Sequence, residues 1–139
     1  MSNLKTFQPK IISNKEISNI VSTKLTSDKI IEVKWNSIID EIETRHLIEL
    51  KNIIQELGAG EKMLIYIDTY NFMAITPEAR QYASSPEASE FTLANAVLID
   101  SLGKKLLFNF FMKISKPTVP TKGFNSKEEA IKWLKEQLN

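Results

Sequence analysis

The sequence has no cysteine, one histidine and only four glycines in 139 residues, and each shortage excludes a kind of chemistry. Without cysteine, the chain has no disulfide, no thiolate nucleophile and no cysteine-based zinc or iron–sulfur site. Zinc would need at least two carboxylates beside the single His46, whereas calcium or magnesium sites made only of oxygen ligands stay open. The four glycines are too scattered for a phosphate-binding loop or a dinucleotide-binding motif. We therefore expect no cofactor and no metal.

A large net charge is also missing. The 18 Lys and Arg residues nearly balance the 17 Asp and Glu residues, which argues against a dedicated nucleic-acid binder because such a protein needs a strongly basic surface. The charges are unevenly distributed, however: residues 36–100 carry a net charge of −7, and residues 101–139 carry +5. This segregation can orient a second copy of the chain or an acidic partner.

No apolar run is long enough to cross a bilayer. The most apolar stretch, residues 106–114, is interrupted by Asn109 and Lys113 and is far shorter than the ~20 residues that a membrane-spanning helix needs. The first 15 residues also lack the features of a secretory signal. We therefore expect a cytoplasmic protein.

The length and composition of the chain predict a single globular domain over residues 1–139, in which residues 1–16 form a flexible or extended arm.

The spacing of apolar residues predicts five strands. Alternation with polar residues predicts an amino-terminal hairpin at residues 20–25 and 30–35. Residues 63–67 and 94–99 are continuous apolar runs, which are typical of strands covered on both faces in a parallel sheet. Two prolines then lead into a short edge strand at residues 121–124.

Helices alternate with these strands. Apolar residues at intervals of three and four predict the longest helix over residues 38–57. Two short helices that begin at Thr76 and Ser85, or one helix bent at Pro86, are predicted next. The last two predicted helices are one over residues 102–114 and one that follows Ser126. Helical crossovers between strands require a largely parallel core. The sequence therefore predicts an α/β fold in which a mixed sheet of about five strands, including the amino-terminal hairpin, packs with four or five helices.

The only histidine lies within the predicted helix over residues 38–57. At about 100° per residue, His46 points in the same direction as Leu50 and Ile53, toward the sheet. This position favours a core histidine bonded to a backbone carbonyl over a catalytic one. The chain also lacks a nucleophile-elbow sequence. We therefore assign a structural role to His46 and expect no enzyme activity.

The order of elements, from about residue 17 onward, is similar to that of a known group of domains. Local matches are the segment from Thr76 to Arg80, residues 94–100, and a tail that contains Pro117, Pro120, Thr121, Phe124, Ala130, Trp133 and Leu134. In these features the chain resembles the STAS group, the SpoIIAA-like folds of anti-sigma-factor antagonists, and in particular its uncharacterised bacterial branch of STAS/CRAL-TRIO-like proteins. The resemblance implies a SpoIIAA-like fold and a regulatory or protein-interaction role.

The resemblance also implies a candidate phosphorylation switch. In the antagonists, a phosphorylatable hydroxyl residue follows an aspartate in an Asp-Ser-x-Gly turn, and Asp68 and Thr69 match its first half. Asn71 and Phe72 depart from the glycine-containing half. In the alternative interpretation, Asp68 only ends a strand and Thr76 only caps the next helix.

A polar crevice is predicted where two strands end. Asp68 and Asp100 close strands that we expect to be parallel neighbours, and ligands of such sheets bind at the carboxyl ends of the strands. Thr69, Asn71 and Ser101 would lie in the same crevice. The alternative is that these residues cap the helices that follow. An enzyme, the third functional hypothesis, would rest on this crevice alone.

The predicted helix over residues 102–114 is apolar around well over half of its circumference, whereas a surface helix needs only one apolar stripe. We predict that Phe108, Phe111 and Met112 contact a partner or a ligand. The leading hypothesis is a non-enzymatic interaction or regulatory module that forms a homodimer. The alternative is a binder or sensor of a small apolar ligand in a pocket lined by this helix. Burial of the same face by neighbouring segments of one chain is a third explanation.

Overall fold

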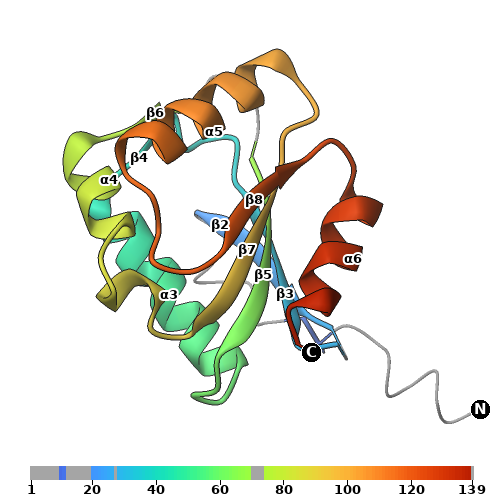
Figure 1. The fold of residues 1–139 in the computed structure, drawn as a ribbon. Coiled ribbons are helices and arrows are strands. Elements are labelled where there is room, and N and C mark those ends of the chain that lie inside the picture. Colours follow the sequence, from blue (N-terminus) through green and yellow to red (C-terminus); the bar gives the residue numbers. More distant parts are fainter. Residues whose placement is uncertain (1–9, 12–19, 27, 70–73, 139) are drawn as a thin grey trace, which may run out of the picture.

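A six-stranded mixed sheet forms the middle layer of the molecule (Figure 1). The computed structural model describes residues 10–11, 20–26, 28–69 and 74–138. The strands, in their order across the sheet, are β1 (Lys10–Ile11), β2 (Val21–Leu25), β3 (Ile30–Trp35), β5 (Met63–Asp68), β7 (Thr92–Leu98) and β8 (Thr121–Phe124). The first three pair antiparallel, and β3, β5, β7 and β8 pair in parallel. The predicted mixed sheet is confirmed. Of the predicted arm over residues 1–16, only β1 lies within the described residues.

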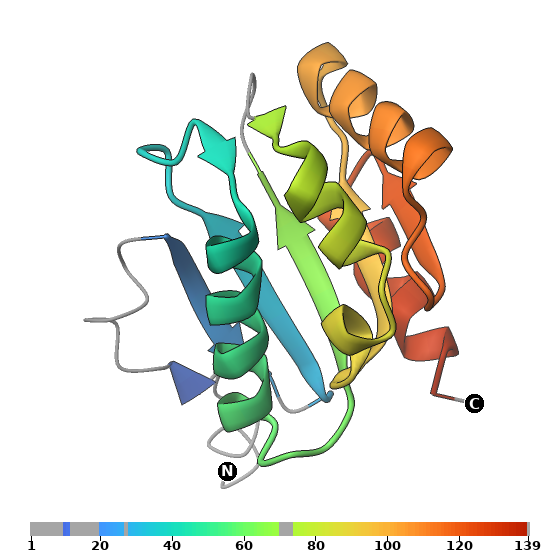
Figure 2. The same ribbon diagram turned by 90° about the vertical axis from the view of Figure 1, so that its left-hand side faces the viewer.

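Helices cover both faces of this sheet (Figures 1 and 2). One face carries α3 (Thr44–Leu57), α4 (Pro77–Ala83), the short 3-10 helix η1 (Glu87–Ser89) and α5 (Leu102–Ile114). The other face carries α6 (Lys127–Glu136). Two cores result, one on each side of the sheet. Ile30 and Leu64 belong to the core beneath α6, whereas the next residues, Ile31 and Ile65, belong to the core beneath α3. Burial of both faces explains why β5 is continuously apolar from Met63 to Ile67.

The predicted helix starts at Thr76 and Ser126 are confirmed, whereas the segment after Ser85 forms only the 3-10 helix η1, which begins at Glu87. The Ala79 backbone N–H donates to Thr76 Oγ1 over 3.1 Å at the start of α4, and the Ala88 N–H donates to Ser85 Oγ over 3.3 Å. Corresponding bonds to Ser101 Oγ and Ser126 Oγ cap α5 and α6. Each cap satisfies a backbone donor that has no partner within its own helix.

The predicted start of the longest helix is wrong. Helix α3 begins at Thr44 rather than at residue 38, because the preceding residues form a strand, β4 (Glu41–Ile42). Strand β4 pairs in parallel with β6 (Ala74–Ile75) in a second, two-stranded sheet, and the Thr76 N–H donates to the Ile42 carbonyl over 3.0 Å. Ile42 lies in a strand but is buried, so its apolar side chain fits the spacing from which the helix was predicted.

His46 is buried at the start of α3, as predicted, but its bonding differs from the prediction. Its Nδ1 accepts a hydrogen bond from the Glu43 backbone N–H over 2.9 Å, so the imidazole caps the helix rather than donating to a carbonyl. Nδ1 must be unprotonated to accept this bond. Burial, followed by the nearby charge of Arg45, lowers the pKa of His46 below its ordinary value of 6.5. The folded protein therefore holds His46 in its neutral form.

This capping bond predicts a loss of stability in mild acid. Because the folded-state pKa of His46 is lowered, its contribution is fully present above pH 6.5, the ordinary pKa, and is lost as the pH falls toward the folded-state value. Urea unfolding at pH 7.5 and 5.5 measures this change. His46→Gln is the control, since glutamine at this helix position can also accept from the cap N–H but does not titrate. An equal pH dependence in the two proteins would contradict the assignment.

Candidate functional site

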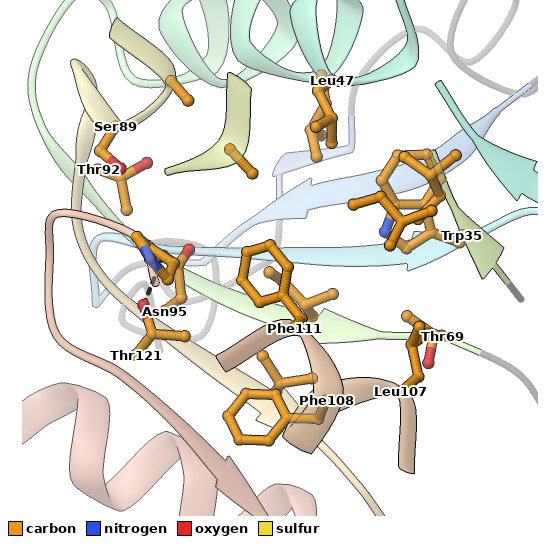
Figure 3. Close-up of a pocket in the computed structure, with 18 of the residues that line it drawn as sticks. Trp35, Leu47, Thr69, Ser89, Thr92, Asn95, Leu107, Phe108, Phe111 and Thr121 are labelled. Carbon is orange, nitrogen blue, oxygen red and sulfur yellow. Dashed lines mark hydrogen bonds between the residues drawn. The ribbon is translucent and has the colours of Figure 1, made fainter. Parts of the chain in front are cut away.

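Helix α5 covers part of the sheet without burying any of its own residues. Leu107, Phe108 and Phe111 face inward and are half-buried, and they line a cavity of about 210 Å³ between α5, α3, α4 and the sheet (Figure 3). The predicted surface residues Phe108 and Phe111 therefore lie beneath the helix, whereas Met112 is half-buried and is not a lining residue.

Helix α5 comes close to the sheet at Phe108. A Cβ atom at Gly123 of β8 would lie 3.1 Å from Cε2 of this ring, which is tighter than ordinary packing allows. The missing side chain at Gly123 therefore lets the phenyl ring lie against β8.

One end of the cavity is mainly apolar, although Thr69 lies there too (Figure 3). Trp35 from β3 and Leu107 from α5 lie at this end, and Phe111 lies toward the centre (Figure 3). Ile42, Ile67 and Ile75 also line the cavity and belong to β4, β5 and β6. The two-stranded sheet of β4 and β6 thus contributes directly to the wall.

The other end of the cavity is polar. Ser89, Thr92, Asn95 and Thr121 gather there (Figure 3). The Asn95 amide Nδ2 donates to Thr121 Oγ1 over 3.2 Å, and the Thr121 hydroxyl donates to the Val119 carbonyl over 3.0 Å.

The predicted carboxylates meet beside α5. Lys104 Nζ donates to Asp68 Oδ1 over 3.0 Å and to Asp100 Oδ1 over 2.9 Å, so one ammonium group holds both aspartates together. The hydrogen bond from Lys104 lowers the pKa of Asp100. Burial opposes the charge of Lys104, but the two carboxylates outweigh burial and raise the pKa of Lys104. The cluster is therefore a bridged ion pair in which the lysine is protonated.

The other predicted crevice residues have separate positions. Thr69 follows β5 and lines the cavity, and Ser101 caps α5. Asn71 and Phe72 lie outside the described residues. The phosphorylation of Thr69 stays a prediction.

Three important residues were not among the predicted site residues. Lys104 follows Asp100 by four residues, a spacing that signals a helical ion pair, although its contact with Asp68 is not local. Asn95 is a polar residue within the apolar run of β7, and this interruption could have marked it as a site residue. Tyr82 lines the cavity from α4, and no pattern in the sequence marks it.

Comparison with known proteins places the chain in a family. A family model described as a domain of unknown function (DUF7793) matches residues 23–138. The chain belongs to the DUF7793 family. No curated protein matches this DUF7793 sequence.

A solved structure has the same fold as this DUF7793 chain. It is an uncharacterised protein of the DUF3478 family with a SpoIIAA-like fold, from Shewanella loihica PV-4, and the two chains align with a TM-score of 0.52. The alignment covers 91% of this chain and 95% of the other at 12% sequence identity. The predicted resemblance to SpoIIAA-like domains is therefore confirmed at the level of the fold.

No group of three or more His, Asp or Glu side chains within the described part of this DUF7793 chain could hold a metal ion. No helix in the same residues is long and apolar enough to cross a membrane.

The ion-pair cluster predicts a specific change in titration. Lys104→Gln removes the ammonium group, so the pKa of the Asp100 carboxyl should rise from its lowered value toward the ordinary 3.8. Carboxyl-detected NMR titration measures this pKa. Lys105→Gln changes the neighbouring, exposed lysine and serves as the control. If the Asp100 titration is the same in the wild type and Lys104→Gln, the bridge is wrong.

Proposed function

We propose that this DUF7793 protein binds a small, mainly apolar molecule in the cavity beneath α5. The main support is the placement of Phe108 and Phe111, which line the cavity from a helix that has no buried residue. Binding cavities are typically concave and apolar and carry a few polar groups, and this cavity has that composition. The role is that of a carrier or sensor, without a chemical reaction.

The size of the cavity limits the size of the ligand. A protein cavity of ~150 Å³ lined by apolar side chains binds benzene. A cavity of about 210 Å³ therefore suits a molecule of roughly ten non-hydrogen atoms. Ethylbenzene is a suitable probe because it is apolar and falls near this size.

Two neighbouring leucines of α5 provide a matched test of the cavity. Leu107 lines it, whereas Leu106 points outward and is 60% exposed. Leu107→Trp should fill the cavity and weaken ethylbenzene binding at least tenfold, about 1.4 kcal/mol, whereas Leu106→Trp should leave binding unchanged. Ligand-observed NMR titration measures both. No binding to the wild type, or equal binding to both variants, would contradict the proposal.

A second candidate function, self-association, is supported by the outer side of α5. Leu102, Leu106, Phe110 and Ile114 follow one another at intervals of four residues and are 47–72% exposed. We call these four residues the outer stripe. Exposed apolar stripes of this kind commonly mark interaction surfaces.

The distribution of charge favours a second copy of the chain as the partner. Residues 101–139, which include the outer stripe, carry a net charge of +5, and residues 36–100 carry −7. Because the two segments have net charges of opposite sign, a basic segment of one copy can attract the acidic segment of another. The inward cavity and the outer stripe lie on opposite sides of α5, so ligand binding and self-association are compatible.

Self-association predicts a mass that depends on the outer stripe. Leu106→Glu places a charge in the middle of the stripe and should convert a dimer to a monomer in multi-angle light scattering. Ile48→Glu is the control, since Ile48 is also exposed but lies on α3. A monomeric wild type, or a dimer that persists in Leu106→Glu, would exclude this interface.

A further inference from the structure

The amide of Asn95 has a fixed orientation at the polar end of the cavity. Asn95 is half-buried in the middle of β7 and lines the cavity (Figure 3). Its Nδ2 donates to Thr121 Oγ1 over 3.2 Å, and the Thr121 hydroxyl donates to the Val119 carbonyl over 3.0 Å. Because a hydroxyl has only one hydrogen, Thr121 Oγ1 can only accept from the amide. The nitrogen of Asn95 must therefore face Thr121, and its oxygen Oδ1 is directed elsewhere.

Oδ1 of Asn95 is an accessible acceptor without a donor. It accepts no hydrogen bond from the described part of the chain. In the same residues, the unpaired side-chain atoms that solvent cannot reach belong to Thr23, Arg80 and Tyr82, so Oδ1 is not closed off. An amide oxygen only accepts hydrogen bonds. A ligand that covers Oδ1 and excludes water must therefore bring a donor, because binding is weakened when the hydrogen bond made by water is not replaced.

The charges around the cavity disfavour a charged ligand. Two lysines line it, and both are already paired. Lys51 Nζ lies 3.0 Å from Glu90 Oε1, and Lys104 bridges Asp68 and Asp100. An anion would thus lose its hydration without an unpaired cation to receive it. A cation would also lack a partner, because no acidic residue of the described part of the chain lines the cavity.

We propose that the ligand is a neutral amphiphile whose polar head donates a hydrogen bond to Asn95 Oδ1, while its apolar body lies against Phe111 and Leu107. An alcohol, a phenol or an amide N–H can supply this donor. The inference rests on the proposed ligand-binding function and specifies its ligand class. Ser89 and Thr92 lie at the same end of the cavity, but their hydroxyls can either donate or accept. The requirement for a donor therefore comes from Asn95.

Four probes with an ethyl-substituted ring test this inference: ethylbenzene, 4-ethylphenol, 4-ethylpyridine and 4-ethylbenzoate. At pH 8, 4-ethylpyridine is neutral and can only accept a hydrogen bond, whereas 4-ethylbenzoate is charged and also has no donor. The wild type should bind 4-ethylphenol at least tenfold more tightly than either of these two, because 4-ethylphenol is the probe that can donate to Oδ1. Ligand-observed NMR titration measures all four affinities.

Asn95→Leu tests the residue itself. It replaces the amide by an apolar side chain of similar size, so it should weaken 4-ethylphenol binding at least tenfold and leave ethylbenzene binding unchanged or tighter. Retained ethylbenzene binding also shows that the variant is folded. Asn52→Leu is the matched control, because Asn52 is an exposed asparagine of α3 that does not line the cavity. This control should bind both probes as the wild type does.

The probe order in the wild type decides the inference even if Asn95→Leu does not fold. Equal binding of 4-ethylphenol and 4-ethylpyridine to the wild type, or 4-ethylphenol binding that survives in Asn95→Leu, would overturn the inference. The cavity proposal stays intact in both cases if ethylbenzene binds. If none of the probes binds the wild type, both proposals are wrong.

Discussion

The parallel pairing of β3, β5 and β7 is the constraint on which the rest of the structure depends. Ile30 of β3 and Leu64 of β5 are buried on one face of the sheet, and Ile31 and Ile65 are buried on the other, so helices must cover both sides. Parallel pairing also brings the carboxyl ends of β5 and β7 to the same edge, where Asp68 and Asp100 follow them. The ion-pair cluster and the position of α5 both result from this arrangement.

The two faces of the sheet are covered in different ways. Beneath α6, Ala94, Ala96 and Ala130 are fully buried, and such small side chains let helix and sheet approach closely. Beneath α5, the inward residues are large and meet Asn95 and Val97 of β7 around a cavity. Helix α5 contacts β8 through Phe108 and Asp68 through Lys104, and its inward side chains line the cavity. Its cavity is therefore a consequence of side-chain size on the two faces.

Most of the fold could be predicted because its signals are local. The alternation in β3 and the caps at Thr76, Ser101 and Ser126 each depend on a few neighbouring residues. The start of α3 could not be predicted in this way. Ile42 continues the helical spacing, and only the pairing of β4 with β6, more than 30 residues away, shows that it lies in a strand.

The candidate site was predictable only in part. The meeting of Asp68 with Asp100 followed from parallel topology, whereas the bridge through Lys104 depends on where α5 lies. The sequence showed that α5 is apolar around most of its circumference. It did not show which side of the helix faces the sheet, because both the inner and the outer face are apolar. The buried hydroxyl of Tyr82 depends on tertiary packing alone.

If α5 covers a ligand cavity, a small apolar probe must bind beneath this helix, and the position of the bound probe tests this most directly. Intermolecular NOEs between ethylbenzene and methyl groups of the protein report this position. The account predicts NOEs to Leu107, Val97 and Thr92, which line the cavity. NOEs confined to Leu106 and Ile114, on the exposed side of α5, would contradict it.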